Sequence, residues 1–254
     1  MRCRRGLGRV WVHAALAVVS RFLIDLRLGP RDLATAAELV ASVALCIPAG
    51  VAPPLLPVDN HLPYPAALLQ VFGEVLHRRR KRRRGRKKAP GLKPPPGFLA
   101  GVVEKVRVTS GRVIKVRAKA LFGRLKAIKA RVAELGIGTT VNTSYLERLN
   151  GTLRSQQARL VRRGRCVSRD GRRLQWSLWL WRDLYNWVRV HGALEGRPPA
   201  MAIGLTERVW SVLEYVRHPV HVDELTRAIG AEERGDVLTS AREREKRRKS
   251  VPTS

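Results

Sequence analysis

Residues 142–154, NTSYLERLNGTLR, hold the side chains best suited to chemistry in this chain. In a helix over this stretch, Glu147, Asn150 and Arg154 share one face. The neighbouring face carries three leucines, Leu146, Leu149 and Leu153. The pattern therefore predicts a carboxylate beside an amide and a guanidinium, held over a packed apolar surface.

A second carboxylate, Asp59, ends the apolar run PPLLPVD. A carboxylate at a strand end and another on a helix can together hold divalent metal ions for phosphoryl transfer, provided that folding brings them together. A solvated glutamate on an amphipathic helix is the simpler interpretation of Glu147 taken alone. The chemistry of Asp59 and Glu147 thus depends on the elements that position them.

The pattern over residues 10–75 predicts an α/β layout of strand, strand, helix, strand and helix. Ser20 marks a tight turn between the first two strands, and Asp32 is placed to cap the first helix. The expected elements are strands over 10–18 and 21–28, a helix over 33–45, an apolar strand ending at Asp59, and a helix over 64–75.

Beyond residue 100 the pattern predicts a hairpin and three helices. Weak alternation over 102–116 indicates two strands that turn at Ser110-Gly111. Helices are expected over 118–135, around Glu147, and over 172–190. The last of these carries four of the six tryptophans, and their helical spacing favours core packing over base stacking.

The charge of the chain points to a polyanionic partner. The sequence has 50 Lys and Arg against 20 Asp and Glu, a net charge of +30. Such a charge repels itself in a compact state unless a polyanion binds, which favours nucleic acid, with an anionic membrane surface as the competitor. A hydrophobic content of 44% argues against wholesale disorder.

Between residues 78 and 88 every residue except Gly85 is Arg or Lys, and KPPPG follows at 93–97. This basic block is the predicted DNA-binding segment, formed by Arg78, Arg79, Arg80, Lys81, Arg82, Arg83, Arg84, Arg86, Lys87 and Lys88. Its composition predicts an insertion or linker over 77–99. It would divide a core into parts at 1–76 and 100–212, with a charged tail at 213–254.

A cytoplasmic location without a membrane span is expected. The three cysteines form no CxxC pair, which suits a reducing compartment. The apolar N-terminus imitates a signal peptide, but residues 22–28 then alternate like a strand. A second apolar stretch, 33–58, contains four prolines that would break a spanning helix.

Three segments resemble DDE-type insertion-sequence transposases. Asp59 with Tyr64-Pro65 is similar to the aspartate-then-tyrosine segment of that family. The run SYLERLNGTLRSQQARLVRRG looks like its glutamate helix, with the pattern E-R-x-N-x-x-L-R. The run from Tyr185, with Y-N-x-x-R-x-H ending at His191, is similar to the closing segment. The first two strands and GPRDLATAAELV also look like the opening of that catalytic core, so the resemblance covers about 10–76 and 100–212.

The resemblance implies an RNase H-like mixed sheet flanked by helices, with a basic insertion and a helical C-terminal part. In that family two aspartates and a glutamate hold two Mg²⁺ (or Mn²⁺) ions for DNA cleavage and strand transfer. Asp59 would be the second acid and Glu147 the third. Asn150, Arg154 and His191 would support them. The implied partners are DNA, as transposon ends and target, and a second copy in a homodimer.

The sequence departs from the family at several positions. The first aspartate should lie on a strand ahead of the first hairpin, where residues 1–9, MRCRRGLGR, contain no acid. Asn60 stands where the family commonly has glycine, and Pro57 is expected to interrupt the strand before Asp59. The resemblance therefore implies a truncated, inactive transposase. Two alternatives remain: a non-enzymatic nucleic-acid-binding protein derived from such a core, and an unselected reading frame whose product does not fold.

Overall fold

The computed structural model describes residues 10–48, 50–76, 91–160, 168 and 170–218. The basic block therefore lies outside the described residues, as does the tail beyond residue 218. The chain divides into two compact units, Met1–Trp210 and Ser211–Ser254. In the second, helix α7 (Val212–Arg217) begins with a capping box in which Ser211 and Glu214 exchange hydrogen bonds.

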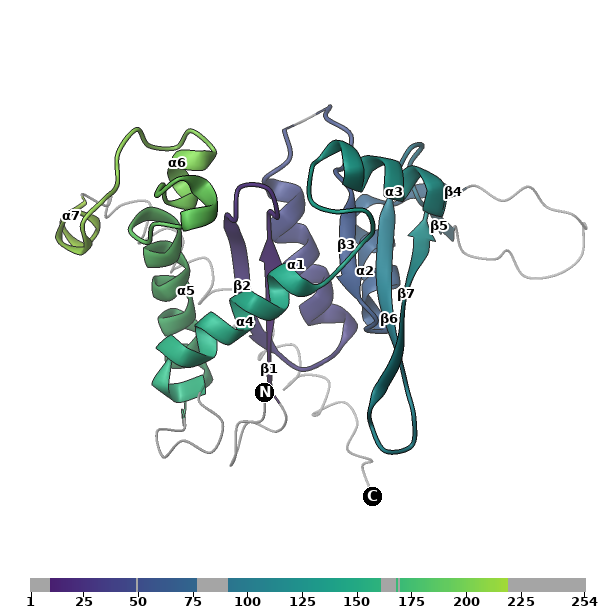
Figure 1. Ribbon diagram of the computed structural model, residues 1–254, viewed down its shortest axis with the longest axis horizontal. Helices are drawn as coiled ribbons and strands as arrows, with labels where there is room; N and C mark the ends of the chain where they lie inside the picture. The colour runs from purple at the N-terminus through teal and green to yellow at the C-terminus, as the bar shows by residue number, and fades with distance from the viewer. Residues whose placement is uncertain (1–9, 49, 77–90, 161–167, 169, 219–254) are drawn as a thin grey trace, which may run out of the picture. The chain divides into compact units, whose positions relative to one another are not determined.

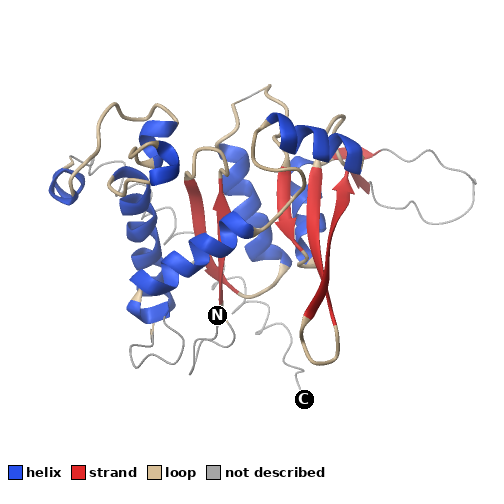
Figure 2. Ribbon diagram, viewed as in Figure 1, coloured by secondary structure: helices blue, strands red, loops and turns tan. Residues whose placement is uncertain are grey.

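The first unit is a mixed α/β structure (Figure 2). Its first part comprises β1 (Trp11–Leu16), β2 (Leu23–Gly29), α1 (Leu33–Leu45), β3 (Leu56–Asp59), α2 (Pro63–Phe72), β4 (Glu74–Leu76) and β5 (Gly91–Lys93). Its second part comprises β6 (Ala100–Arg107), β7 (Val113–Phe122), α3 (Leu125–Glu134), α4 (Ser144–Gln156), η1 (Ala158–Leu160), α5 (Gly171–Trp187), η2 (Gly192–Leu194) and α6 (Pro199–Ala202). The mixed α/β class predicted from the sequence is confirmed.

The strands that the structure describes form three separate groups. β1 and β2 pair antiparallel, and β4, just ahead of the stretch 77–99 expected to be a linker, forms a short antiparallel pair with β5, which lies within that stretch. β3 pairs parallel with β6, which pairs antiparallel with β7. Figure 1 shows β1–β2 and β3–β6–β7 standing beside one another with no strand drawn between β1 and β3.

Helices cover both faces of the β1–β2 pair. Leu149 and Leu153 of α4 join Leu26 of β2 in one buried cluster with α5. Asp25 points to the other face, where Ser42 of α1 donates a hydrogen bond to its carboxylate. The hairpin is therefore sandwiched between α1 and α4, while α1 also packs on α2 and the β3–β6–β7 sheet.

Two amide side chains of α5 form hydrogen bonds with backbone groups on the edge of β2 that faces away from β1. Gln175 accepts a hydrogen bond from the Leu28 N–H at 2.7 Å and donates one to the Leu26 carbonyl at 2.7 Å. Asn186, which is buried, forms the same pair of bonds with the N–H and carbonyl of Leu23, both at 2.9 Å. These side chains take the place of a neighbouring strand on that edge.

Several local predictions are confirmed. Helix α1 has the bounds expected from the sequence, and Asp32 caps it by accepting a hydrogen bond from the Thr35 N–H. Trp181 is buried as core packing predicts. Trp176 is not, since 59% of it is exposed.

The helix predicted over 118–135 is wrong in its first part, because β7 extends to Phe122. Ala118 and Ala120 pack beneath α3 with the period of a strand. Gly123 then turns the chain at a φ of 77°, a conformation that suits glycine, before α3 begins at Leu125. The helix predicted over 64–75 likewise ends early, at Phe72, because β4 follows Gly73.

The expectation that Pro57 interrupts its strand is also wrong. Leu56 donates its N–H to the Leu99 carbonyl, so the backbone of the next residue, Pro57, faces away from β6. A proline at such a position removes no hydrogen bond from the ladder. β3 therefore runs through Pro57 to Asp59.

Candidate functional site

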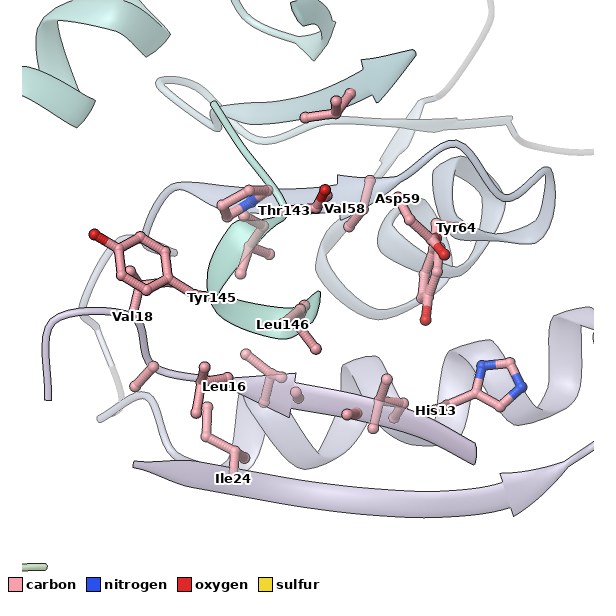
Figure 3. Close-up of a pocket in the computed structure, with 18 of the residues that line it drawn as sticks. His13, Leu16, Val18, Ile24, Val58, Asp59, Tyr64, Thr143, Tyr145 and Leu146 are labelled. Atoms are coloured by element: carbon pink, nitrogen blue, oxygen red, sulfur yellow. The ribbon is translucent and has the colours of Figure 1, made fainter. Parts of the chain in front are cut away.

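One cleft, here called the β1–β3 cleft, lies between the two larger strand groups and has a cavity volume of about 700 Å³. One side is formed by residues 11–19, which comprise β1 and the turn after it. The other side is formed by residues 54–61, in and around β3. Leu39, Val40 and Val43 of α1 and Tyr145 and Leu146 of α4 close it. Figure 3 shows β1 and β3 on opposite sides of this space, with the start of α4 beside them.

Asp59 lies exposed at the end of β3, where the sequence places it, in the wall of the cleft. Tyr64 stands near it (Figure 3). Burial of Tyr64, and secondarily the negative charge of Asp59, raises the pKa of the Tyr64 hydroxyl well above its ordinary value. Tyr64 therefore stays protonated beside a carboxylate, and it is a hydrogen-bond donor rather than a base.

Two histidines, His13 of β1 and His61, gather beside Asp59 with their ring centroids 6.2 Å apart. Burial lowers the pKa of both, which keeps the rings neutral at pH 7. His13 contacts the Pro30 carbonyl, whereas His61 Nε2 is buried with no hydrogen-bond partner among the described residues. No pattern in the sequence indicates this pair, because the two rings come together only through the approach of β1 to residue 61.

Glu147 lies exposed in the first turn of α4, and the Thr143 hydroxyl donates a hydrogen bond to its carboxylate at 3.0 Å. A carboxylate in the first helical turn is stabilised by the positive end of the helix dipole. Glu147 and Asn150 both line the β1–β3 cleft with Asp59. That the carboxylates of Asp59 and Glu147 come within metal-bridging distance stays a prediction.

The other supporting residues lie elsewhere. Arg154 is exposed near the end of α4, and neither Arg154 nor His191 lines the cleft. Across the described part of the chain, no three His, Cys, Asp or Glu side chains are placed to share one metal ion. Asp59 and Glu147 alone are too few ligands for a pair of divalent ions, which prefer six or more oxygen ligands each.

His191 belongs to a second, cationic cluster. Its ring packs edge-on against Tyr185 at 4.7 Å, and Arg21 stacks on the Tyr145 ring at 4.0 Å. Burial, then the charges of Arg189 and Arg21, lower the pKa of His191. His191 Nε2 and one guanidinium nitrogen each of Arg21 and Arg189 are buried without a hydrogen-bond partner in the described structure.

This arrangement predicts that acidification destabilises the fold through His191. The unfolded chain binds a proton near the ordinary histidine pKa of about 6.5, whereas the folded chain resists it. Stability is therefore present at neutral pH and falls as the pH drops below that value. We expect a lower midpoint of urea unfolding at about pH 5.5 than at about pH 7.5. In the His191→Gln variant, the difference between these two midpoints should be smaller. A difference of the same size in His191→Gln would assign the effect to other groups.

Comparison with protein-family models, curated proteins and solved structures finds no match to this chain. Among the described helices, none is long and apolar enough to cross a membrane.

Proposed function

We propose that this chain is an RNase H-like core derived from a DNA transposase, and that it binds DNA without cleaving it. One observation carries the proposal: Asp59, at a strand end, and Glu147, on a helix, line the same cleft of a chain with a net charge of +30. The order of hairpin, α1, β3 and α2 ahead of the glutamate helix supports the same core.

A magnesium or manganese ion bound between Asp59 and Glu147 would supply Lewis-acid stabilisation of phosphate oxygens. The donor set does not fit a metal pair, because Asp59 and Glu147 are the only carboxylates among the described residues that line the cleft, and two hard cations need more anionic oxygen ligands than these two supply. No catalytic step is therefore assigned to this chain. Cleavage and strand transfer belong to the family that it resembles.

DNA binding is supported by basic surface on described helices as well as by the basic block. Lys126 and Lys129 are exposed on α3, and Arg148 and Arg154 are exposed on α4. On α3 the one acidic residue, Glu134, pairs with Arg131. Charges of this kind contact phosphates without reading sequence.

We expect no Mg²⁺- or Mn²⁺-dependent nicking of supercoiled plasmid by the 254-residue chain. Mutation of a group that only orients a metal ligand already lowers metal affinity or activity by about 10–100-fold. Loss of a ligand itself, here the family's first aspartate, is expected to lower them further. The assay is gel analysis of plasmid incubated with each metal, beside a Glu147→Gln control of equal length.

Robust nicking that Glu147→Gln abolishes would contradict this expectation and show that another group completes the site. Salt-dependent DNA binding with no nicking would support the proposal, a non-cleaving DNA-binding core, over an active transposase. A molten, protease-sensitive product would contradict both the proposal and an active transposase.

A further inference from the structure

The His191 cluster, defined here as His191, Arg189 and Arg21, joins two distant stretches of the chain. Arg189 and His191 follow the end of α5, and Arg21 lies in the segment between β1 and β2. The His191 ring packs edge-on against Tyr185, with ring centroids 4.7 Å apart. The positive charges of Arg189 and Arg21 act on the rings of both Tyr185 and His191. The fold therefore gathers two permanent cations around one imidazole.

Hydrogen bonds hold the Arg21 segment against this end of α5. Two residues after Arg21, the backbone N–H and carbonyl of Leu23 bond to the side-chain amide of Asn186, both at 2.9 Å. Asn186 lies about one helical turn before Arg189. The Arg21 guanidinium also stacks on the Tyr145 ring, 4.0 Å from its centroid. The position of Arg21 is thus fixed from both α5 and α4.

The backbone of Arg21 is strained. Its φ is 57°, a left-handed conformation that residues with a Cβ rarely adopt. Glycine would close the same turn without strain. Strain of this kind concentrates at ligand-binding positions, where a particular side chain is needed in a particular place. The arginine at residue 21 therefore points to a role for its guanidinium.

The His191 cluster lacks hydrogen-bond acceptors. His191 Nε2 and one guanidinium nitrogen each of Arg21 and Arg189 are buried without a partner in the described structure. The acids nearest to the cluster along the chain are engaged by other arginines: Asp183 by Arg182 at 2.8 Å, and Glu195 by Arg197 at 3.0 Å. Desolvated cations and donors are costly unless an anion pairs with them. The composition of the cluster therefore favours an anionic ligand.

Such a ligand has access to the cluster from solvent. Arg21, Arg189 and His191 are each only partly buried, and Val190, between two of them, is 52% exposed. The number of donors selects among anions. A phosphate group presents enough anionic oxygens for three donors, whereas a carboxylate has two oxygens, and the guanidinium fork matches phosphate geometry.

We propose that Arg21, Arg189 and His191 form a binding site for a phosphate group. The two guanidinium groups hold its oxygens, and the His191 ring donates a third hydrogen bond. Without an anion, burial and the two positive charges keep this ring neutral by lowering its pKa. A bound phosphate group opposes those charges, so the ring gains a proton on binding. The proposal follows from this cluster alone and does not depend on the proposed function.

The test follows the histidine rings of the intact chain by NMR while inorganic phosphate is added. We expect phosphate to raise the pKa of His191 and to leave that of His13, in the β1–β3 cleft, unchanged. Chloride at matched ionic strength controls for screening of the net charge. An unchanged pKa of His191 in phosphate would overturn the proposal.

Arg189→Gln should bind phosphate at least about tenfold more weakly, as expected for the loss of hydrogen bonds from a charged group. Its matched control is Arg173→Gln, which removes the same charge from a side chain of α5 that is 75% exposed. Arg189→Gln should also raise the pKa of His191 before phosphate is added, because a neighbouring cation is gone. That shift shows that the variant is folded. Equal phosphate affinity of the two variants would contradict the site.

A DNA duplex added to the phosphate-bound chain distinguishes the source of the phosphate group. Release of inorganic phosphate from the His191 cluster would support a backbone phosphate of nucleic acid as the ligand. Retention of phosphate by the DNA-bound chain would support a free phosphorylated compound. Failure of the chain to bind DNA would contradict the proposed function alone, because the response of His191 to inorganic phosphate does not involve DNA.

Discussion

Replacing the basic block, residues 78–88, by a Gly/Ser segment of equal length is expected to lower the salt dependence of DNA binding by several units. Each phosphate contact adds about 0.9 to the slope of log affinity against log salt, and the block holds ten basic residues. Six to ten contacts account for a loss of about 10³–10⁵-fold in affinity between 50 and 200 mM salt. The measurement is fluorescence anisotropy of a labelled duplex over a salt series.

Equal length matters in this variant, because β4 and β5 flank the segment and pair through Glu74 with Lys93 and Leu76 with Gly91. The matched control is Lys126→Gln with Lys129→Gln on α3, which removes two exposed charges and should lower the slope by at most about two units. An unchanged slope in the Gly/Ser variant would show that the basic block does not touch DNA.

Asp25→Ala is expected to lower the free energy of unfolding by about 3–5 kcal/mol, because it removes the buried carboxylate of an ion pair and leaves Arg27 without its counter-charge. The Asp25 carboxylate is 4% exposed and lies 2.6 Å from Arg27 Nε and 3.6 Å from Arg182 Nη1. It also accepts hydrogen bonds from Ser42 and the Leu26 N–H, so it links β2 to α1 and α5. Such a loss is a large part of the 5–15 kcal/mol typical of a domain.

The control for Asp25→Ala is Glu134→Ala, which breaks another Arg–carboxylate pair with the same 2.6 Å separation, but on the surface of α3. An exposed pair contributes at most about 1 kcal/mol. Urea unfolding of both variants at neutral pH is the measurement. Because the two ion pairs have the same separation, a larger loss of stability in Asp25→Ala would be due to the burial of its carboxylate. Similar losses in the two variants would contradict a buried structural role for Asp25.

Asp25 also predicts behaviour in acid. Burial by itself would raise its pKa, but hydrogen bonds from Ser42 and Arg27 and the charge of Arg27 outweigh it and lower the pKa below the ordinary value. The stability that Asp25 contributes is therefore present at neutral pH and is lost as the pH falls below about 4. The Asp25 carboxylate contacts Ser42 of α1 and Arg182 of α5, and Asp25 does not line the β1–β3 cleft.

The elements that the sequence predicts correctly are those whose pattern or cap lies within the element itself. The alternation of the first hairpin, the Asp32 cap of α1 and the apolar spacing of α4 and α5 each lie within one element. The extension of β7 to Phe122 depends instead on pairing with β6, so the local pattern of the basic stretch 118–135 predicts one helix where the structure has a strand and a shorter helix.

The candidate site was predictable only in part. The residue types of Asp59 and Glu147 and their resemblance to a transposase family were visible in the sequence, and both residues line one cleft. The neighbouring histidines, His13 and His61, come together through the approach of β1 to the end of β3, which no local pattern records. The placement of β1 and β3 along one cleft likewise depends on strand pairing and packing over long range.

The most direct test of the proposed function is the affinity of the intact chain for two unrelated duplexes of equal length between about 50 and 200 mM NaCl. We predict that both duplexes bind with similar affinity, and that log affinity falls steeply and in parallel for the two as log salt rises. No measurable binding, or an affinity that does not change with salt, would contradict a DNA-binding role for this chain.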